Sequence, residues 1–143
     1  MKLLSRVAGL LVLLTLLILL IRGDLLSRSP IVILAQVVAL VVLIWARSSF
    51  QAGQFRVVAT PSGGPLLRAG PYRFIRHPMY AGLMLVGLAL LLSRFSPLAL
   101  VFFLLFASAT FVKAKLEETL MERMHPKYRD YKRQVKMFIP YLF

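Results

Sequence analysis

Four long apolar stretches constrain what this chain can fold into more than any other feature of its sequence. They cover residues 3–21, 31–46, 79–92 and 98–112. A soluble domain of 143 residues, 59% of them hydrophobic, cannot bury so much apolar surface, because small domains have a high ratio of surface to volume. Lipid must cover part of it, so we expect a single all-α domain over residues 1–143, an integral membrane helical bundle with four transmembrane helices.

The basic residues are unevenly distributed among the segments that flank these stretches. Of the 18 Lys and Arg residues, 15 lie in the N-terminal segment, the loop over residues 47–78 and the tail over residues 113–143. Because cytoplasmic segments carry the excess of positive charge, we expect both termini, this loop and the helical tail in the cytoplasm. Topology and anionic membrane lipid then explain the net charge of +13, and we expect no nucleic acid as a partner.

Local signals predict where several helices begin and end. Ser-Pro pairs at residues 29–30 and 96–97 are good N-cap and first-turn pairs. We expect the last apolar helix to continue through residues 113–124 and to break at the His-Pro pair that follows. A second short helix is expected over residues 127–136. The apolar, aromatic end, residues 137–143, is expected to lie at the interface or to pack back on the protein.

A cluster of polar and aromatic residues joins the 47–78 loop to the third apolar stretch. Two arginines, a histidine and two tyrosines lie within the nine positions from Tyr72 to Tyr80. A helix that begins near Pro78 directs free backbone N–H groups and the positive end of its dipole at the interface, which suits a carboxylate. The same residue types also form the belts found at membrane interfaces, although a belt does not require a His-Pro pair. On these residues alone both interpretations stay open.

Two adjacent carboxylates, Glu117 and Glu118, follow the fourth stretch. Neighbouring side chains on a helix point about 100° apart, so we expect one carboxylate on the solvated side near Lys115 or Glu122 and the other facing a cavity near the membrane. Lys113 lies one turn earlier and is placed to pair with Glu117 at i, i+4. A solvated helix face is the alternative, but acidic residues are rare in this basic chain and these two can hold a cationic ligand.

Several other kinds of site are disfavoured. The chain has no cysteine and two histidines, so it has no disulfide or thiolate nucleophile, and a zinc site would need unusual ligands. It has no Walker loop and no G-x-G-x-x-G segment, which excludes a soluble Rossmann-type methyltransferase or dehydrogenase. Ser62 and Ser96 have no evident His–acid partners for nucleophilic catalysis.

Together, the two constellations resemble motifs of the isoprenylcysteine carboxyl methyltransferase family, which is related to the phospholipid N-methyltransferases. The first motif is Gly70-Pro71-Tyr72 followed by Arg76-His77-Pro78-x-Tyr80-x-Gly82. The second is Glu117-Glu118 followed by His125-Pro126-x-Tyr128-x-x-Tyr131, Val135 and Ile139-Pro140. The similarity covers roughly the C-terminal two thirds of the chain, and the motifs stand in order at the two ends of a predicted helical hairpin.

The resemblance implies S-adenosyl-L-methionine as the cofactor and assigns roles by position. The residues expected to bind it are Gly64, Pro65, Leu66, Leu67, Tyr72, His77, Pro78, Met79, Tyr80, Glu117 and Glu118. The first glutamate is expected to hold the polar end of the cofactor, and Lys113 and Arg76 are the expected catalytic residues. Lys113 stands where the prenylcysteine enzymes have an arginine for the substrate carboxylate. Lysine cannot reproduce that bidentate contact, which argues against a prenylcysteine carboxylate as acceptor.

The expected reaction is methyl transfer to a lipophilic or membrane-embedded small molecule. Such a transfer is an in-line displacement, and positioning of donor and acceptor supplies much of the rate. The acceptor atom, whether oxygen, nitrogen or sulfur, stays open. Two alternatives also stay open. One is an NADPH-dependent membrane reductase of the sterol-reductase-like type, which shares the Arg-His-Pro-x-Tyr segment but lacks the paired glutamates, and the other is a non-catalytic membrane scaffold.

Overall fold

A computed structural model describes residues 2–22, 29–49 and 66–142, and within these ranges the chain is helical, with no β-strand and one isolated bridge. The helices are α1 (Lys2–Arg22), α2 (Pro30–Ser48), α3 (Pro78–Ser93), α4 (Pro97–Met124) and α5 (Tyr128–Gln134), with a 3₁₀ turn, η1 (Gly70–Arg73). The all-α prediction is confirmed for the described residues. The four apolar stretches fall inside α1 to α4.

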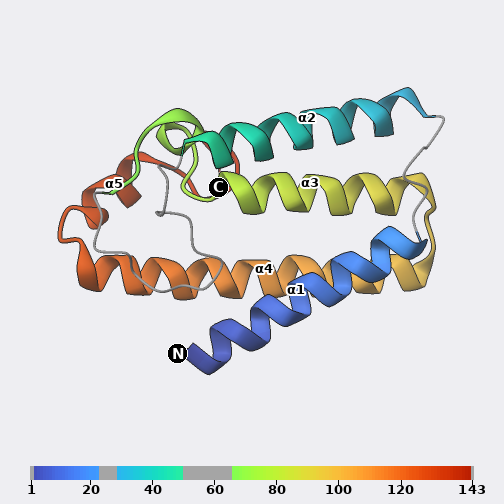
Figure 1. Ribbon diagram of the computed structural model, residues 1–143, viewed down its shortest axis with the longest axis horizontal. Helices are drawn as coiled ribbons and strands as arrows, with labels where there is room; N and C mark the ends of the chain where they lie inside the picture. The colour runs from blue at the N-terminus through green and yellow to red at the C-terminus, as the bar shows by residue number, and fades with distance from the viewer. Residues whose placement is uncertain (1, 23–28, 50–65, 143) are drawn as a thin grey trace.

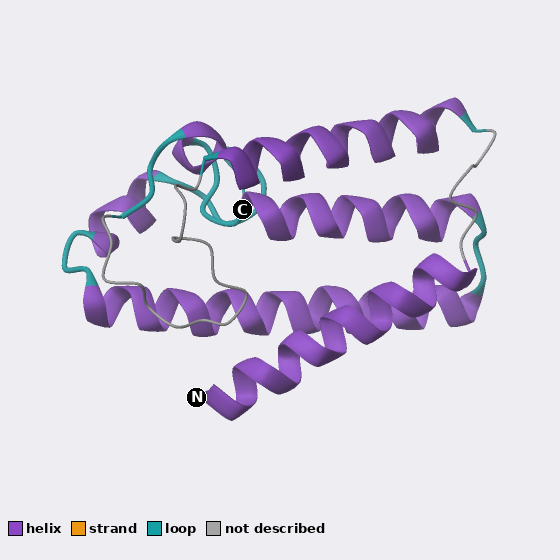
Figure 2. Cartoon of the chain, in the orientation of Figure 1, coloured by secondary structure: helices purple, strands orange, loops and turns teal. Residues whose placement is uncertain are grey.

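The helices form two pairs, which meet where α3 packs against α4. In Figure 1, α2 runs alongside α3 and α1 crosses over α4, in agreement with their contacts. Figure 2 shows that helices make up most of the described chain and that loops connect them at the ends of the bundle. Phe106 of α4 is fully buried, with Val12 of α1 and Ala109 of α4 packed around it. Gly87 lets α3 approach this ring, since a Cβ there would lie 3.1 Å from Phe106 Cε1.

Large apolar side chains cover much of the outer surface. Leu10, Ile31 and Leu34 are each more than 60% exposed, which fits contact with lipid better than contact with water. By length and composition, α2 and α4 can each cross a membrane, and α3 is a shorter apolar helix. The prediction of four spans, with a cytoplasmic loop and tail, stays a prediction.

Helix α4 carries the second motif well beyond its apolar part. Ser96 precedes its first residue, and the Ser96 hydroxyl accepts a hydrogen bond from the Ala99 N–H at 3.1 Å, so the predicted N-cap is confirmed. Its 28 residues extend about 42 Å. His125 leaves the helix in an extended conformation, which confirms the predicted break.

The segment before α3 is joined to the C-terminal segment by backbone hydrogen bonds. The Arg76 N–H donates to the Lys136 carbonyl at 2.8 Å, and the His77 N–H donates to the Met137 carbonyl at 3.1 Å. This pairing corrects the helix predicted over residues 127–136: α5 ends at Gln134, because the following residues are extended to make these bonds.

The apolar end of the chain divides into a buried and an exposed part. Met137 and Phe138 are 4% and 7% exposed, so this part packs back on the protein as expected. Ile139 and Leu142 are exposed. Gly70 in η1 has φ 58°, and a Cβ there would lie 2.2 Å from Ser49 Oγ, so glycine is favoured where the 66–77 segment turns toward α3.

Candidate active site

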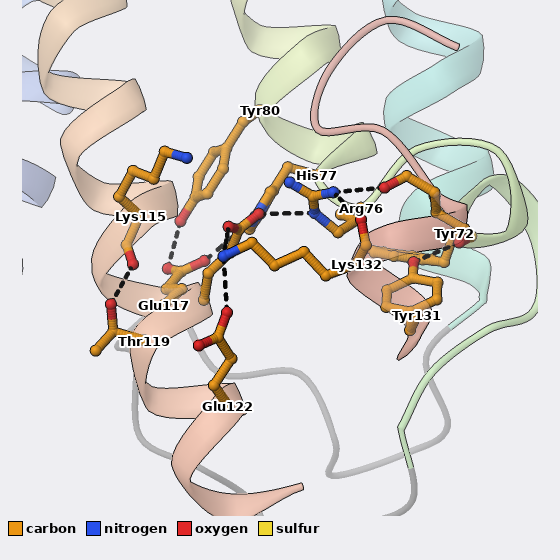
Figure 3. A network of polar contacts seen from close by, with 12 residues as sticks. Tyr72, Arg76, His77, Tyr80, Lys115, Glu117, Thr119, Glu122, Tyr131 and Lys132 are labelled. Atoms are coloured by element: carbon orange, nitrogen blue, oxygen red, sulfur yellow. Dashed lines mark hydrogen bonds and ion pairs between the residues drawn. The ribbon is translucent and has the colours of Figure 1, made fainter. Parts of the chain in front are cut away.

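Both predicted motifs meet at one end of the bundle, where the start of α3, the polar part of α4 and the C-terminal segment come together (Figure 3). The predicted site residues that the structure brings into this cluster are Tyr72, Arg76, His77, Tyr80, Lys113, Glu117 and Glu118. The structure therefore joins segments about 40 residues apart in the chain, as the order of the two motifs predicted.

The remaining predicted residues lie at the margin of this cluster or outside the described residues. Pro78 is fully buried at the first position of α3, with Met79 next to it and partly buried. Leu66 packs against an apolar cluster of Tyr128, Tyr131 and Val135, and Leu67 is partly buried. Gly64 and Pro65 fall outside the described residues.

The Glu117 carboxylate forms the more open half of the site. Glu117 Oε1 accepts a hydrogen bond from the Tyr80 hydroxyl at 2.5 Å and lies 3.4 Å from Lys113 Nζ. The predicted i, i+4 pair of Lys113 and Glu117 is thus confirmed. The Glu117 side chain is 24% exposed, so a ligand can still reach the carboxylate.

The Glu118 carboxylate forms the closed half. Its side chain is 1% exposed; Oε1 lies 2.7 Å from Arg76 Nε, and Oε2 lies 3.2 Å from Lys132 Nζ. Lys132 also bonds Glu122 at 2.7 Å. Burial by itself raises the pKa of Glu118, but hydrogen bonds from His77 and Arg76 outweigh burial and hold that pKa at about 2, so the group stays ionised.

His77 lies between the two carboxylates. Its Nδ1 is 4.0 Å from Glu117 Oε2, and its Nε2 is 3.3 Å from Glu118 Oε1. As expected, one glutamate is the more exposed and the other is enclosed, but both carboxylates also face His77. The 100° between successive side chains directs the two carboxylates to opposite edges of one imidazole. The ring also stacks on Tyr80, with centroids 5.6 Å apart, and lies 5.9 Å from the Phe138 ring.

Arg76 joins three parts of the chain. Besides the bond to Glu118, its Nη1 donates to the carbonyls of Lys132, at 3.0 Å, and Val135, at 2.5 Å. The side chain is 7% exposed. Through these contacts, Arg76 holds the end of α5 against α4 and against the segment that precedes α3. A catalytic role for Arg76 stays a prediction.

A second connection fixes Tyr72. The Tyr131 hydroxyl donates to the Tyr72 carbonyl, and the Arg68 guanidinium lies 5.3 Å from the centre of the Tyr131 ring. Burial raises the pKa of Tyr131 to about 12, although Arg76 and Arg68 act to lower it. Burial, and then the charges of Tyr131 and Glu117, also raise the pKa of Tyr72.

Two residues of the cluster had no predicted role. Lys132 binds Glu118 and Glu122, and Phe138 packs against His77. Lys132 belongs to a run of basic residues that is typical of a solvated surface. Phe138 belongs to the apolar C-terminal end, which shows no helical or strand periodicity. No local pattern distinguishes either residue, because their partners lie on α4 and before α3.

The sequence is also similar to those of known proteins. The model of the isoprenylcysteine carboxyl methyltransferase (ICMT) family matches residues 28–123, about two thirds of the chain. A methanethiol S-methyltransferase from Crocosphaera subtropica is 38% identical over 76 residues, which cover 50% of this chain and 28% of that relative. The matching region thus spans less than a third of the relative's length. By the family match, the chain belongs to the isoprenylcysteine carboxyl methyltransferase family.

Proposed function

We propose that the protein is a membrane methyltransferase that uses S-adenosylmethionine and acts on a lipophilic thiol. The observation that carries the proposal is the partly exposed carboxylate of Glu117, flanked by Tyr80 and Lys113, in a member of a methyltransferase family. A relative named for S-methylation of methanethiol supports a thiol as the acceptor group.

The residues around Glu117 fit the parts of the cofactor. A partly exposed carboxylate can bind the cationic amino group through charge-assisted hydrogen bonds. Lys113 Nζ, 3.4 Å from Glu117, carries the opposite charge needed for the cofactor's own carboxylate. The rings of Tyr80 and His77 stack next to them, and aromatic faces attract a cation such as a sulfonium. Glu118 is enclosed at 1% exposure, whereas Glu117 is 24% exposed, so we assign the amino group to Glu117.

The chemistry requires little from the protein beyond binding and orientation. When bound, the cofactor supplies an electrophilic methyl carbon on a sulfonium sulfur. The acceptor's sulfur forms the new bond to that carbon as the old carbon–sulfur bond breaks; the electron pair stays on the departing sulfur, and the thiol proton passes to water. Holding the reactants in line supplies much of the rate. The buried contacts of Arg76, His77 and Glu118 keep the binding groups in place.

We further propose four spans, formed by α1, α2, α3 and the apolar part of α4 over residues 98–112. Both termini and the polar cluster then lie on the cytoplasmic side, where a soluble cofactor is available. The uneven distribution of Lys and Arg supports this topology. Helix α3, at 16 residues, measures about 24 Å, less than a typical hydrocarbon core of about 30 Å, so it needs its flanks or a locally thinner bilayer.

The proposal is tested by calorimetry of the full chain in detergent with S-adenosylmethionine and its demethylated product. We expect binding of both. Glu117→Gln should weaken it ~10-fold or more, the loss expected for a hydrogen bond to a charged group. The matched control is Asp130→Asn, which removes an exposed carboxylate of α5 and should leave the affinity unchanged.

A second experiment identifies the product. The protein is incubated with methyl-labelled cofactor and a total lipid extract supplemented with alkanethiols, and we expect labelled thioethers. Absence of cofactor binding under all lipid conditions would overturn the proposal. Binding of NADPH in its place would favour the reductase, and cofactor binding without any methyl transfer would favour the scaffold.

A further inference from the structure

A large apolar cleft lies between α2, α3, α4 and the C-terminal segment. Its volume is about 890 Å³, within the range of roughly 300–1,000 Å³ that is common for small-molecule sites. Its walls include Trp45 of α2, Leu88 of α3, Phe103 of α4 and Ile139 of the C-terminal segment. Among the described residues, none that lines the cleft is charged.

One end of the cleft adjoins the candidate active site. Phe138 lines the cleft, and the centre of its ring is 5.9 Å from that of His77. Ala81 and Gly82 line it too, and they follow Tyr80 directly on α3. This end of the cleft therefore lies next to the residues that flank Glu117.

The other end extends away from the polar cluster along α3. Ala81 and Leu88 both line the cleft and are seven residues apart, which is two helical turns or about 10 Å. Phe103 of α4 lines the cleft as well. The cleft is thus long enough for an extended apolar chain with its reactive end at Ala81.

The lining also determines which charge an occupant can carry. Within the described part of the chain, the only polar side chains that line the cleft are Trp45, through its indole N–H, and Ser108, through its hydroxyl. Neither can neutralise an ion, and burial of an uncompensated charge among apolar groups is strongly unfavourable. Lys113, the cation predicted to meet a substrate carboxylate, does not line the cleft and is paired with Glu117. An ionised acceptor is therefore disfavoured.

We propose that this cleft is the acceptor site and that it selects uncharged, lipophilic acceptors, with the reactive atom next to Phe138 and the apolar chain directed toward Leu88. This inference rests on the proposed methyltransferase function. It assigns the specificity to the apolar lining and excludes acceptors that carry a carboxylate on the chain.

The chain offers a direct probe of occupancy. Trp45 is the single tryptophan and lines the cleft, so a bromoalkane bound there quenches its fluorescence. The full chain in detergent, without cofactor, is titrated with 1-bromooctane and with 8-bromooctanoate at pH 8, where the carboxylate is ionised. We expect saturable quenching by the first compound and none by the second.

Two matched variants of α4 distinguish binding in the cleft from binding on the outer surface. Ala107→Phe fills the cleft and should weaken 1-bromooctane binding ~10-fold. Leu104→Phe adds a ring at a position that is 55% exposed and outside the lining, and it should leave binding unchanged. In methyl-transfer assays, Ala107→Phe should raise KM for octanethiol while methanethiol is still methylated, which shows that the variant is folded.

Quenching that rises linearly with 1-bromooctane, without saturation, and equally in the wild type, Ala107→Phe and Leu104→Phe would overturn the proposal. It would show that the cleft is filled by ordinary lipid chains. Equal binding of the bromocarboxylate would overturn the charge selectivity. The quenching assay needs no cofactor, so its failure is distinguishable from failure of the proposed function, which the calorimetric experiment tests separately.

Discussion

Glu117 and Glu118 are neighbours in α4, yet their carboxylates lie at opposite edges of the His77 ring and in different environments. Glu118 is 1% exposed and contacts Arg76, His77 and Lys132. Glu117 is 24% exposed and contacts Tyr80 and Lys113. Loss of a carboxylate enclosed by protein cations leaves buried charges unpaired and lowers stability, whereas a carboxylate that remains accessible can bind a ligand.

The same comparison distinguishes the two predicted catalytic residues. Arg76 belongs to the closed half, where its contacts are to Glu118 and to backbone carbonyls of the C-terminal segment. Lys113 belongs to the open half, next to Glu117. We therefore expect substitutions in the closed half to lower stability and substitutions in the open half to lower binding.

The largest effect is expected for Glu118→Ala. The variant leaves the Arg76 guanidinium buried without its carboxylate, and breaking a buried ion pair in this way costs about 3–5 kcal/mol of unfolding free energy. Thermal unfolding of the full chain in detergent measures the loss. Glu122→Gln, which removes the more exposed partner of Lys132, is the control and should cost under about 1 kcal/mol. Equal melting temperatures for the two variants would contradict the closed half as a stabilising element.

Arg76→Lys should have the next largest effect. Lysine keeps the charge but cannot bond Glu118 and two carbonyls at once, so we expect a loss of about 2 kcal/mol. Hydrogen exchange should become faster in residues 128–138, which these bonds hold in place. A fall in kcat with unchanged stability and exchange would instead identify Arg76 as a catalytic residue.

The pH dependence of unfolding provides a third test. The pKa of Glu118 is about 2 in the folded protein, below its ordinary value of 4.5. Its contribution to stability is therefore fully present above pH 4.5 and is lost as the pH falls from 4.5 toward 2. Wild-type protein should lose stability more steeply in this window than Glu118→Gln, which cannot titrate. If the stability of the two proteins fell in parallel with pH, other groups would dominate acid unfolding.

The smallest effect on stability is expected for Glu117→Gln. The group is partly exposed and its ion pair with Lys113 is within one helix, so the change should cost under about 1 kcal/mol in thermal unfolding. A stability loss as large as that of Glu118→Ala would remove the distinction between the two glutamates.

Much of the local structure could be predicted from the sequence. The apolar stretches, the Ser96 N-cap and the break at His125 depend on residues within a few positions of one another, and each was found where it was expected. The pair of Lys113 and Glu117 follows from helical spacing alone. The end of α5 could not be predicted in this way, because it is set by the long-range bridge between Ile75 and Lys136.

The sequence by itself determined that the chain forms apolar helices, that basic residues flank them and that two polar motifs stand at the ends of a hairpin. Only the tertiary structure decided which glutamate is enclosed, that Arg76 and Lys132 enclose it, and that Phe138 joins the site to an apolar cleft. The physical reason is the range of the interactions: helix propensity, capping and i, i+4 pairing act over one or two turns. The contacts of Glu118 join residues 42 and 14 positions apart, and such contacts form only once the helices have packed.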